Sequence, residues 1–282
     1  MSKKILIEEI GEIRKIVKQN KQRNKSIGFV PTMGFLHQGH ISLIRAARAE
    51  NQIVIVSIFV NPAQFSPDED FEEYPRNLER DISICKDEKV DLIFNPKSEE
   101  IYPKEFETKV SVSELKKPLC GISRPNFFDG ITIVVAKLFN IIEPNNVYFG
   151  QKDAQQALIV KRMIEDLNFP TRMHILPIVR ERDGLAMSSR NKYLSDNERK
   201  SALSLYKSLQ MAKKMIENGE KNSNIIKSKI RKFIKNMPFT KIDYIEIVDY
   251  EKLQSVQEIR SNTLVALAVW VGKTRLIDNV LV

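Results

Sequence analysis

Short apolar runs alternate with amphipathic segments through the first 180 residues of the chain. Residues 52–60 are a run rich in Ile and Val without strict alternation, which is typical of a parallel strand covered on both faces. Residues 26–30 and 90–94 are predicted as further short strands. Residues 40–50 instead place apolar side chains three and four positions apart, as the buried face of a helix does. Strand, helix and strand in this order predict βαβ units.

The same pattern continues to residue 179. A leading helix is expected within residues 5–19, after a short extended start, and Pro31-Thr-Met-Gly34 should end the first of the strands above. Residues 131–142 contain many β-branched side chains, but their spacing favours a helix capped by Asp129. Helices over 77–88 and 153–167 and strands over 147–149 and 173–179 complete the set. The prediction is a Rossmann-like, doubly wound parallel sheet formed by residues 1–180.

A polar stretch, residues 180–192, separates this pattern from a different one. Ser195-Asp-Asn-Glu198 has the spacing of a capping box and should open a helix that ends near residue 218. A second helix is expected over 223–235, followed by strands over 241–248, 264–271 and 276–280. Residues 181–282 are therefore predicted to form a smaller α+β domain, with the polar stretch as a loop between the domains.

Composition narrows the class of protein. A chain of 282 residues with 42% hydrophobic composition can bury a sizeable core. Two cysteines, Cys85 and Cys120, are too few for a disulfide framework and are expected to be free thiols in a reducing compartment. No stretch has the length of a membrane span and the first residues do not resemble a signal peptide, so a cytoplasmic protein without a membrane partner is expected.

The net charge of +9 raises the question of nucleic acid. Much of it lies in residues 199–235, which hold 11 basic side chains and only two acids, Glu217 and Glu220. Aromatic side chains suited to base stacking are not interleaved with these charges. We interpret the lysines as the solvent faces of two helices and expect no nucleic-acid partner, with RNA binding as the alternative.

His37-Gln-Gly-His40 lies between a predicted strand and the first turn of a predicted helix. Unpaired backbone N–H groups and the helix dipole make such a position an anion site, and the nearby glycines let a ligand approach the backbone. The pattern favours a polyphosphate held by two imidazoles over turn packing or an incidental metal site. The remaining histidine, His174, is interpreted as a satisfied core or surface residue.

Two further segments carry polar and cationic side chains in positions suited to a nucleotide. Met187-Ser-Ser-Arg190 offers two hydroxyls and a guanidinium that can stabilise charge on a leaving pyrophosphate. Gly150-Gln-Lys-Asp153 follows a predicted strand at the edge where open α/β sheets bind ligands. Lys152 is either a phosphate clamp there or part of a plain helix start capped by Asp153. Together with H-x-G-H, the Met187–Arg190 segment resembles the signatures of adenylate-forming nucleotidyltransferases.

The motifs taken together resemble one family closely. They are Pro31-Thr-Met-Gly-Phe-Leu-His-Gln-Gly-His40, Ser57-Ile-Phe-Val-Asn-Pro-Ala-Gln-Phe65, Tyr74-Pro-Arg76, Phe149-Gly-Gln-Lys-Asp153 with Gln155-Gln156, Asp183-Gly-Leu-Ala-Met-Ser-Ser-Arg-Asn191 and Gly272-Lys-Thr-Arg-Leu-Ile-Asp-Asn279. In order and spacing they are similar to the motifs of the pantothenate synthetase family, over nearly the whole chain, with the weakest likeness in residues 200–260.

This resemblance implies roles for individual residues. It makes His40 a proton donor and places His37, Lys152 and Arg190 beside it as catalytic groups. It assigns pantoate to Gln64 and Gln156, with β-alanine also near Gln64, and the neutral side chain of Asn61 suits the same hydroxy acid. The ATP contacts that it implies are Met33, Gly34, Phe35, Leu36, His37, Gln38, Gly39, His40, Gly150, Gln151, Lys152, Asp153, Val179, Met187, Ser188, Ser189 and Arg190.

Two positions depart from the family pattern. The resemblance places Asp81 near Mg²⁺, but Arg80 stands where some relatives have a second acid, which argues against a two-carboxylate metal site. Phe127 stands where many relatives have a histidine before Phe-x-Gly, so an imidazole at that position is not essential if the activity is retained.

The activity that the resemblance implies is the ATP-dependent condensation of pantoate with β-alanine through a pantoyl-adenylate, a step of pantothenate and coenzyme A biosynthesis. It further implies a homodimer, and a second domain that acts as a lid over a hydrolysable intermediate. Two alternatives stay open from the residues alone: a nucleotidyltransferase that moves AMP to a phosphate acceptor, and a non-catalytic nucleotide- or RNA-binding protein.

Overall fold

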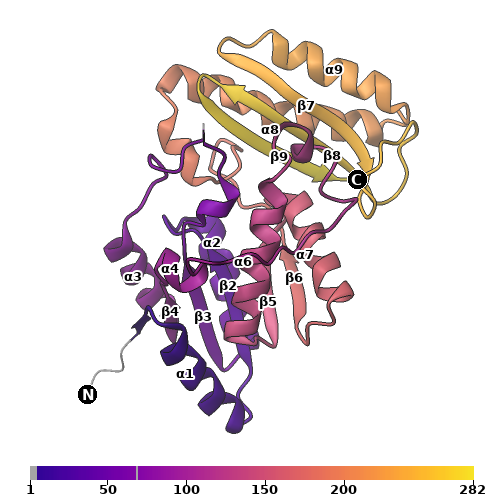
Figure 1. Ribbon diagram of the computed structural model, residues 1–282. Coiled ribbons are helices and arrows are strands. Elements are labelled where there is room, and N and C mark those ends of the chain that lie inside the picture. Colours follow the sequence, from indigo (N-terminus) through magenta and orange to yellow (C-terminus); the bar gives the residue numbers. More distant parts are fainter. Residues whose placement is uncertain (1–4, 68) are drawn as a thin grey trace. The chain divides into compact units, whose positions relative to one another are not determined.

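The computed structural model describes residues 5–67 and 69–282, which form two compact units (Figure 1). The first unit contains the residues up to Ser113 together with Asn126–Gln151 and Ile159–Pro177. The second contains Glu114–Pro125, Lys152–Leu158 and Ile178–Val282. A single cut at residue 180 was expected, whereas the second unit also takes in two segments from earlier in the chain.

Strands and helices alternate through the first unit, as the apolar pattern predicts (Figure 1). The strands are β1 (Leu6–Ile7), β2 (Ile27–Thr32), β3 (Ile53–Ile58), β4 (Leu92–Phe94), β5 (Asn146–Gly150) and β6 (Arg172–Leu176). The helices are α1 (Ile10–Gln22), α2 (Gln38–Glu50), α3 (Leu78–Asp87), α4 (Ser98–Ile101), α6 (Phe127–Ile142) and α7 (Ala154–Asp166), with 3-10 turns η1 (Pro62–Gln64) and η2 (Gln151–Asp153). The first turn of α7 belongs to the second unit.

All six strands of the first sheet are parallel, in the order β1-β4-β3-β2-β5-β6. From β2 the chain moves to β3 on one side, and from β5 it moves to β6 on the other. The strand order therefore reverses between β2 and β5. In open α/β sheets, ligands bind at the carboxyl ends of the strands at such a switch point. The predicted Rossmann-like, doubly wound fold is confirmed.

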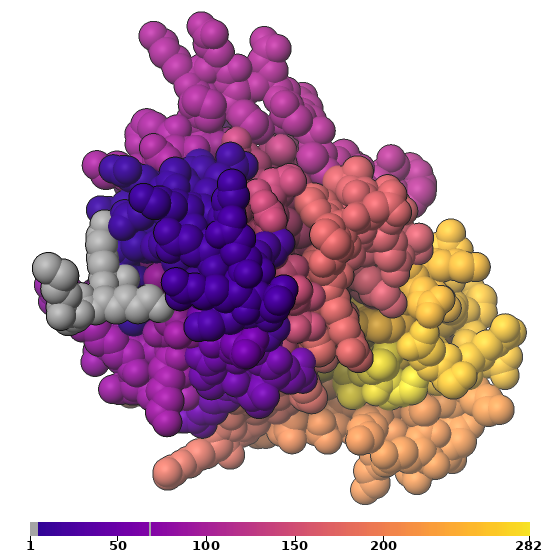
Figure 2. All heavy atoms as spheres, turned by 90° about the horizontal axis from the view of Figure 1, so that it is seen from below, coloured from indigo at the N-terminus to yellow at the C-terminus, as the bar shows by residue number. Residues whose placement is uncertain are grey.

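Apolar side chains cover both faces of this sheet. On one face Val54 and Val56 of β3 pack with Leu43, Ile44 and other residues of α2 and α3. Alternate residues of a strand point to opposite faces, so Ile53 and Ile55, which are also buried, point to the other side. Burial on both sides explains why β3 has no polar alternation. Figure 2 shows the N-terminal segment, in indigo, at the surface of the molecule.

Several local expectations need correction. Asp129 does not cap α6, because the helix begins at Phe127, with Asn126 in the cap position, and Asp129 lies in its first turn. The segment Pro31-Thr-Met-Gly34 does end β2, as expected, but the strand continues through Pro31 to Thr32, which pair with Ser57 and Ile58 of β3. The expected strand over 173–179 ends at Leu176, just before Pro177, which has no N–H to donate to the sheet. The short helix α4 was not predicted, because it is not long enough to show a period. Strand β1 corresponds to the short extended start that was expected before the first helix.

The second unit is an α+β fold. Ser195 caps α8 (Asp196–Glu217) in the predicted capping box with Glu198, and α9 (Ser223–Lys235) follows. The antiparallel strands β7 (Thr240–Asp249), β8 (Thr263–Val271) and β9 (Thr274–Leu281) pair in the order β7-β8-β9. Short pieces, α5 (Cys120–Ser123) and η3 (Ser189–Tyr193), complete it.

The apolar faces of α8 and α9, the two basic helices, pack inside this unit. Ile226, Ile230 and Ile234 of α9 are fully buried in the core that covers the three-stranded sheet. The lysines lie away from these faces. Lys213, Lys214, Lys229, Lys232 and Lys235 are exposed on the helices, Lys221 is exposed between them, and Lys227 is half-buried beside Glu246. The interpretation of the basic run as solvent faces is confirmed. Within residues 5–67 and 69–282, the helices are all too short or too polar to cross a membrane.

Candidate active site

The loop between β2 and α2 has an unusual backbone. Gly34 and Phe35 are consecutive residues with left-handed φ angles, +83° and +48°. A side chain with a β-carbon is disfavoured in this region, so Phe35 needs support from its surroundings. Thr32 provides part of it, because its hydroxyl accepts the N–H of Gly34 at 3.1 Å while donating to the carbonyl of Ser57 at 2.7 Å.

Asp81 of α3 provides the rest of that support. Its two carboxylate oxygens accept the backbone N–H groups of Phe35 and Leu36 at 2.7 and 2.8 Å. The side chain is 1% exposed, and burial raises the pKa of its carboxyl while the two N–H groups and Arg80 lower it. A turn with two successive left-handed residues aims adjacent N–H groups at one anion, and here that anion is the carboxylate of Asp81.

His37 and His40 are both tied to the start of α2. The Nδ1 atom of His37 accepts the N–H of Gly39 at 3.1 Å, and the Nδ1 atom of His40 accepts the N–H of His37 at 3.3 Å, which forms a capping box. The ring centroids lie 4.0 Å apart. A neutral ring that accepts at Nδ1 carries its proton on Nε2. Both imidazoles are thereby set up as donors at Nε2 beside the positive end of a helix.

Asn61 and Gln64 lie on and beside the 3-10 turn η1. The amide of Asn61 is 1% exposed and is used within the protein: it donates to the Gly130 carbonyl at 2.9 Å and to the Gln64 side chain at 3.2 Å, and it accepts from Tyr102 at 2.7 Å. Gln64 in turn donates to the sulfur of Met33 at 2.7 Å. Asn61 thus holds Gln64 next to the H-x-G-H loop.

Expected site residues lie at the carboxyl ends of β2 and β5, the two strands between which the strand order reverses. Met33 follows the carboxyl end of β2, and Gly150 and Gln151 stand at the carboxyl end of β5, which pairs with β2. A β-carbon built on Gly150 would meet no atom within 4 Å, so its surroundings leave room there. His174 lies on β6, stacked on Tyr148 at 4.7 Å with Nε2 3.1 Å from the Asn146 side chain, and its interpretation as a satisfied histidine is confirmed.

The remaining expected residues lie in the second unit. Lys152 is half-buried, with its ammonium 3.5 Å from the carboxylate of Asp153. Gln156, one turn further along the chain, is also half-buried. Its neighbour Gln155 is 6% exposed and binds the backbone of residues 115–120, donating to Leu115 and Pro118 and accepting from Cys120.

Val179 and Met187 are the two ends of a small hairpin in the second unit. The N–H of Met187 donates to the carbonyl of Val179 at 3.0 Å. At the turn, Gly184 has a φ of +97°, and a β-carbon there would lie 2.2 Å from the ring of Tyr206. The segment continues into η3, where the Ser188 hydroxyl accepts the N–H of Arg190 at 3.3 Å and Ser189 is buried.

A metal site would need several ligating side chains close together. Within the part of the chain that the structure describes, no three His, Cys, Asp or Glu side chains come together as a metal site. Both oxygens of Asp81 already accept backbone N–H groups, and the side chain is nearly inaccessible. These contacts do not fit a magnesium site built on Asp81. Cys85 and Cys120 are free and buried, as expected, and burial raises the pKa of the Cys85 thiol to about 12.

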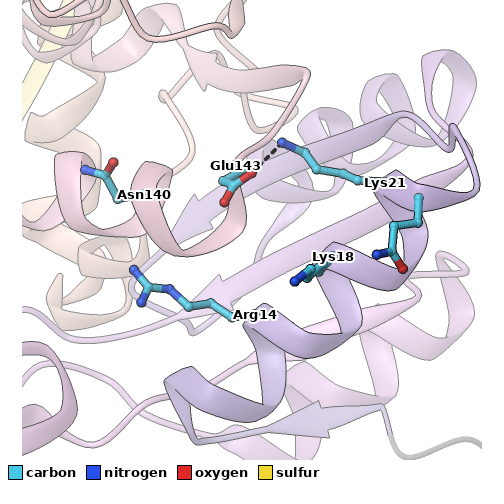
Figure 3. Close-up of a pocket in the computed structure, with 6 residues that line it drawn as sticks. Arg14, Lys18, Lys21, Asn140 and Glu143 are labelled. Atoms are coloured by element: carbon cyan, nitrogen blue, oxygen red, sulfur yellow. Dashed lines mark hydrogen bonds and ion pairs between the residues drawn. The ribbon is translucent and has the colours of Figure 1, made fainter.

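A surface cavity of about 630 Å³ lies between α1 and α6 (Figure 3). Arg14, Lys18 and Lys21 line it from α1, and Asn140 and Glu143 from the end of α6. Lys21 forms a 2.7 Å ion pair with Glu143. The carboxyl end of a helix carries partial negative charge, which attracts cations. These basic side chains therefore complement the end of α6, and an anionic nucleotide would face Glu143 and the helix end there.

Sequence reasoning named the expected site segments but not the long-range contacts that hold them in place. The contacts of Gln155, of Asp81 and of two residues in the last strand, Asp278 and Asn279, all join residues far apart in the sequence. A signal did exist for Asp278: a charged side chain in the strand 276–280, whose other residues are apolar except Asn279, is unexpected and calls for a buried partner.

The chain is similar to known proteins over nearly its whole length. Residues 5–281 match the family model described as pantoate-beta-alanine ligase. A pantothenate synthetase from Thermosipho africanus is 54% identical over 277 residues, which cover 98% of this chain and 99% of the relative. One from Caldicellulosiruptor bescii is 52% identical and covers 99% of both chains.

Solved structures that are similar to this chain carry the same enzyme names as these relatives. The crystal structure of a pantothenate synthetase from Thermus thermophilus matches with a TM-score of 0.94 at 40% identity, covering 98% of this chain and 99% of that one. The pantoate-beta-alanine ligase from Francisella tularensis, crystallised with beta-gamma ATP and beta-alanine, matches with a TM-score of 0.81 at 37% identity, covering 98% and 97%.

Proposed function

The chain belongs to the pantoate-beta-alanine ligase family, and we propose how its own residues carry out the family's reaction. The enzyme is a pantothenate synthetase that condenses pantoate with β-alanine in an ATP-dependent reaction. The observation that carries the proposal is the paired arrangement of His37 and His40 at the start of α2, beside the switch point of the sheet. A solved relative crystallised with an ATP analogue and beta-alanine supports the same substrates.

Activation of the carboxylate is the first chemical need. A carboxylate and an amine form a salt at neutral pH and do not condense, because oxide is too poor a leaving group. In the proposed first step, a carboxylate oxygen of pantoate attacks the α-phosphorus of ATP, and the bond to the bridging oxygen breaks to release pyrophosphate. The product is a pantoyl-adenylate, a mixed anhydride whose leaving group is AMP.

Negative charge grows on the pyrophosphate during this step. We assign its stabilisation to the Nε2–H groups of His37 and His40, to the ammonium of Lys152 and to the guanidinium of Arg190. The proposed nucleotide site also uses the backbone from Met33 to His40, residues 150–153, Val179 and residues 187–190. His40 is the proton donor in this scheme, since its Nδ1 acceptor bond supports a proton on Nε2.

Neutral amide side chains suit the binding of pantoate and β-alanine. Gln64, held by Asn61 and Met33, is the proposed partner of pantoate and of β-alanine, and Gln156 is a further partner of pantoate. The amine of β-alanine then attacks the acyl carbon, the bond from that carbon to the AMP oxygen breaks, and the amine loses a proton as the amide forms. A rival that transfers AMP to a phosphate acceptor would need cationic side chains where this chain has Asn61 and Gln64.

Magnesium enters the proposal only as part of the nucleotide substrate. Phosphate oxygens bind Mg²⁺ with few protein ligands, which agrees with the poor fit of Asp81 to a metal site. We also propose a homodimer that works in the cytoplasm, in line with a biosynthetic enzyme. The second unit is proposed to act as a lid that keeps water from the adenylate. A stiffened 181–192 loop should then release more pyrophosphate per amide formed, and unchanged coupling would count against the lid.

The test is pyrophosphate release by the purified protein with ATP and pantoate, with and without β-alanine, and mass detection of the products. Pantothenate and AMP should accumulate only with both substrates. His40→Ala should reduce turnover by about 10²-fold or more, the size of a general acid contribution. Release with a phosphate-bearing acceptor instead would favour the AMP-transfer rival. Retention of RNA without pyrophosphate release would favour the binding-protein alternative.

A further inference from the structure

Asp278 and Asn279, near the end of the last strand, are buried polar side chains of the second unit. They are 2% and 4% exposed, and the residues on either side of them in the strand, Ile277 and Val280, are apolar. A buried charge is costly unless it is paired and hydrogen-bonded. Because successive residues of a strand point to opposite faces of the sheet, the two side chains reach different parts of the unit.

Asp278 holds the hairpin between Val179 and Met187. Its carboxylate accepts two hydrogen bonds from the Arg180 guanidinium, at 2.7 and 3.0 Å, in the fork geometry that makes such pairs strong. The same guanidinium donates to the carbonyl of Gly184 at 3.1 Å, across the hairpin, and lies 4.7 Å from the centre of the Tyr206 ring. Burial raises the pKa of the Asp278 carboxyl, against the lowering effect of Arg180.

Asn279 reaches the segment that carries Lys152. Its side-chain N–H₂ donates to the backbone carbonyl of Lys152 at 3.0 Å, across 127 residues of sequence. Its backbone N–H donates to the carboxylate of Asp278 at 2.8 Å, so the two residues are also hydrogen-bonded to each other. The ammonium of Lys152 also lowers the pKa of Asp278.

Two neighbouring residues therefore contact two separate segments of the proposed nucleotide site. We propose that Asp278 and Asn279 are positioning residues for ATP: Asp278 fixes the hairpin that ends in Val179 and Met187, and Asn279 fixes the backbone that presents Lys152. This inference rests on the proposed function, because it takes the nucleotide roles of those segments from there. A displaced phosphate contact of about 1 Å can cost on the order of 10²-fold in rate.

Asn279→Asp is the sharpest variant. It keeps the size of the side chain but replaces the donor with a carboxylate oxygen that faces the carbonyl of Lys152. Because Lys152 is proposed to bind phosphates, the variant should weaken binding of an ATP analogue with a non-hydrolysable α,β bridge by about tenfold, and AMP binding much less. Affinities are measured by titration calorimetry, together with KM for ATP and for pantoate. Asn279→Ser is the milder companion if the aspartate does not fold.

The Asp278 anchor is tested by a double-variant cycle. Asp278→Asn should lower ATP affinity and kcat/KM for ATP, and so should Arg180→Gln. If the two groups act as one unit, the double variant should lose no more than either single variant. Ile230→Ala is the matched control: it opens a cavity in the core of the same unit, at a fully buried residue of α9, a helix that packs against α8 and β7. It should lower the melting temperature without changing ATP affinity.

The outcomes separate the two levels of the proposal. Variants at 278 and 279 that lower only the melting temperature, as Ile230→Ala does, and keep the ratio of ATP to AMP affinity would overturn the positioning role while leaving the enzyme assignment intact. A wild-type chain that binds no ATP analogue would overturn both.

Discussion

At the residue scale, the H-x-G-H loop depends on a carboxylate that lies outside its own motif. Phe35 has a left-handed backbone, which is disfavoured for a side chain of its size, and Asp81 offsets that cost by accepting the N–H groups of Phe35 and Leu36. The contact with Phe35 joins residues 46 positions apart. Asp81 thus links α3 to the loop that carries His37 and His40, so the position of the loop depends on that of α3.

Replacing Asp81 by Asn should expose this dependence. An amide offers one acceptor oxygen, so one of the two backbone N–H groups would face an N–H₂ group, and an unmet buried donor costs about 1–3 kcal/mol. We expect a lower melting temperature and a reduction of kcat/KM for ATP by about tenfold or more. The KM for Mg²⁺ at saturating ATP should not change, which distinguishes an anchor from a metal ligand.

Asp91→Asn is the control for that variant. Asp91 also accepts a backbone N–H, that of Val54 at 2.8 Å, but it lies just before β4, at the opposite edge of the sheet from the H-x-G-H loop. It should lower stability and leave kcat/KM for ATP unchanged. A larger effect on Mg²⁺ dependence in Asp81→Asn than on ATP would assign Asp81 to the metal instead.

At the scale of elements, α6 approaches the 3-10 turn η1 more closely than a side chain would allow. A β-carbon on Gly130 would lie 2.0 Å from the carbonyl oxygen of Ala63, and the Gly130 carbonyl accepts from Asn61. Glycine in a helix normally weakens it, so the close approach, rather than helix propensity, explains this residue.

Gly130→Ala sets these two effects against each other. Helix propensity favours alanine by about 1 kcal/mol, whereas a contact of 2.0 Å with backbone forces α6 and η1 apart. The contact should dominate, because overpacking costs about 1–3 kcal/mol or more. We expect a lower melting temperature and a higher KM for pantoate, through the displaced Gln64. A stabilised chain with an unchanged KM would show that the two elements can separate freely.

The capping box of α8 makes a pH-dependent contribution. The backbone N–H and the hydroxyl of Ser195 lower the pKa of Glu198, so its carboxylate favours the folded chain. With a folded pKa below the unfolded value of about 4.3, this stabilisation is present above that value and is lost as pH falls through the folded pKa. Glu198→Gln retains the cap geometry. It should melt below the wild-type temperature at pH 7, because it lacks this charge, and lose less stability than wild type between about pH 5 and pH 3, so that the two melting temperatures converge.

At the scale of the whole molecule, no metal cluster is found among the described residues. We therefore expect divalent cations to be needed for catalysis but not for the stability of the fold. If Mg²⁺ arrives with ATP, removal of divalent cations by EDTA should abolish pyrophosphate release, because Mg²⁺ neutralises the polyphosphate. The melting temperature of the chain without substrates should stay the same. A marked fall in melting temperature on EDTA treatment would reveal a resident structural metal. Differential scanning calorimetry with and without EDTA makes the measurement.

The amino-acid sequence by itself determined the order and type of the long elements, since periods of two and 3.6 residues are local properties that burial on a sheet or helix face imposes. It also determined the chemical groups: the two histidines, Lys152 and the Ser-Ser-Arg segment were all identified from spacing and family motifs.

Only the tertiary structure decided which residues hold those groups. The contacts of Asp81 with the H-x-G-H loop, of Asn61 with Gly130, of Asp278 with Arg180 and of Asn279 with Lys152 span 45 to 127 residues. No local period encodes them. They arise because folding brings distant segments together, at the carboxyl ends of the parallel strands in the first unit and beside the last antiparallel strand in the second. A buried polar group is stable there only beside a partner that folding supplies.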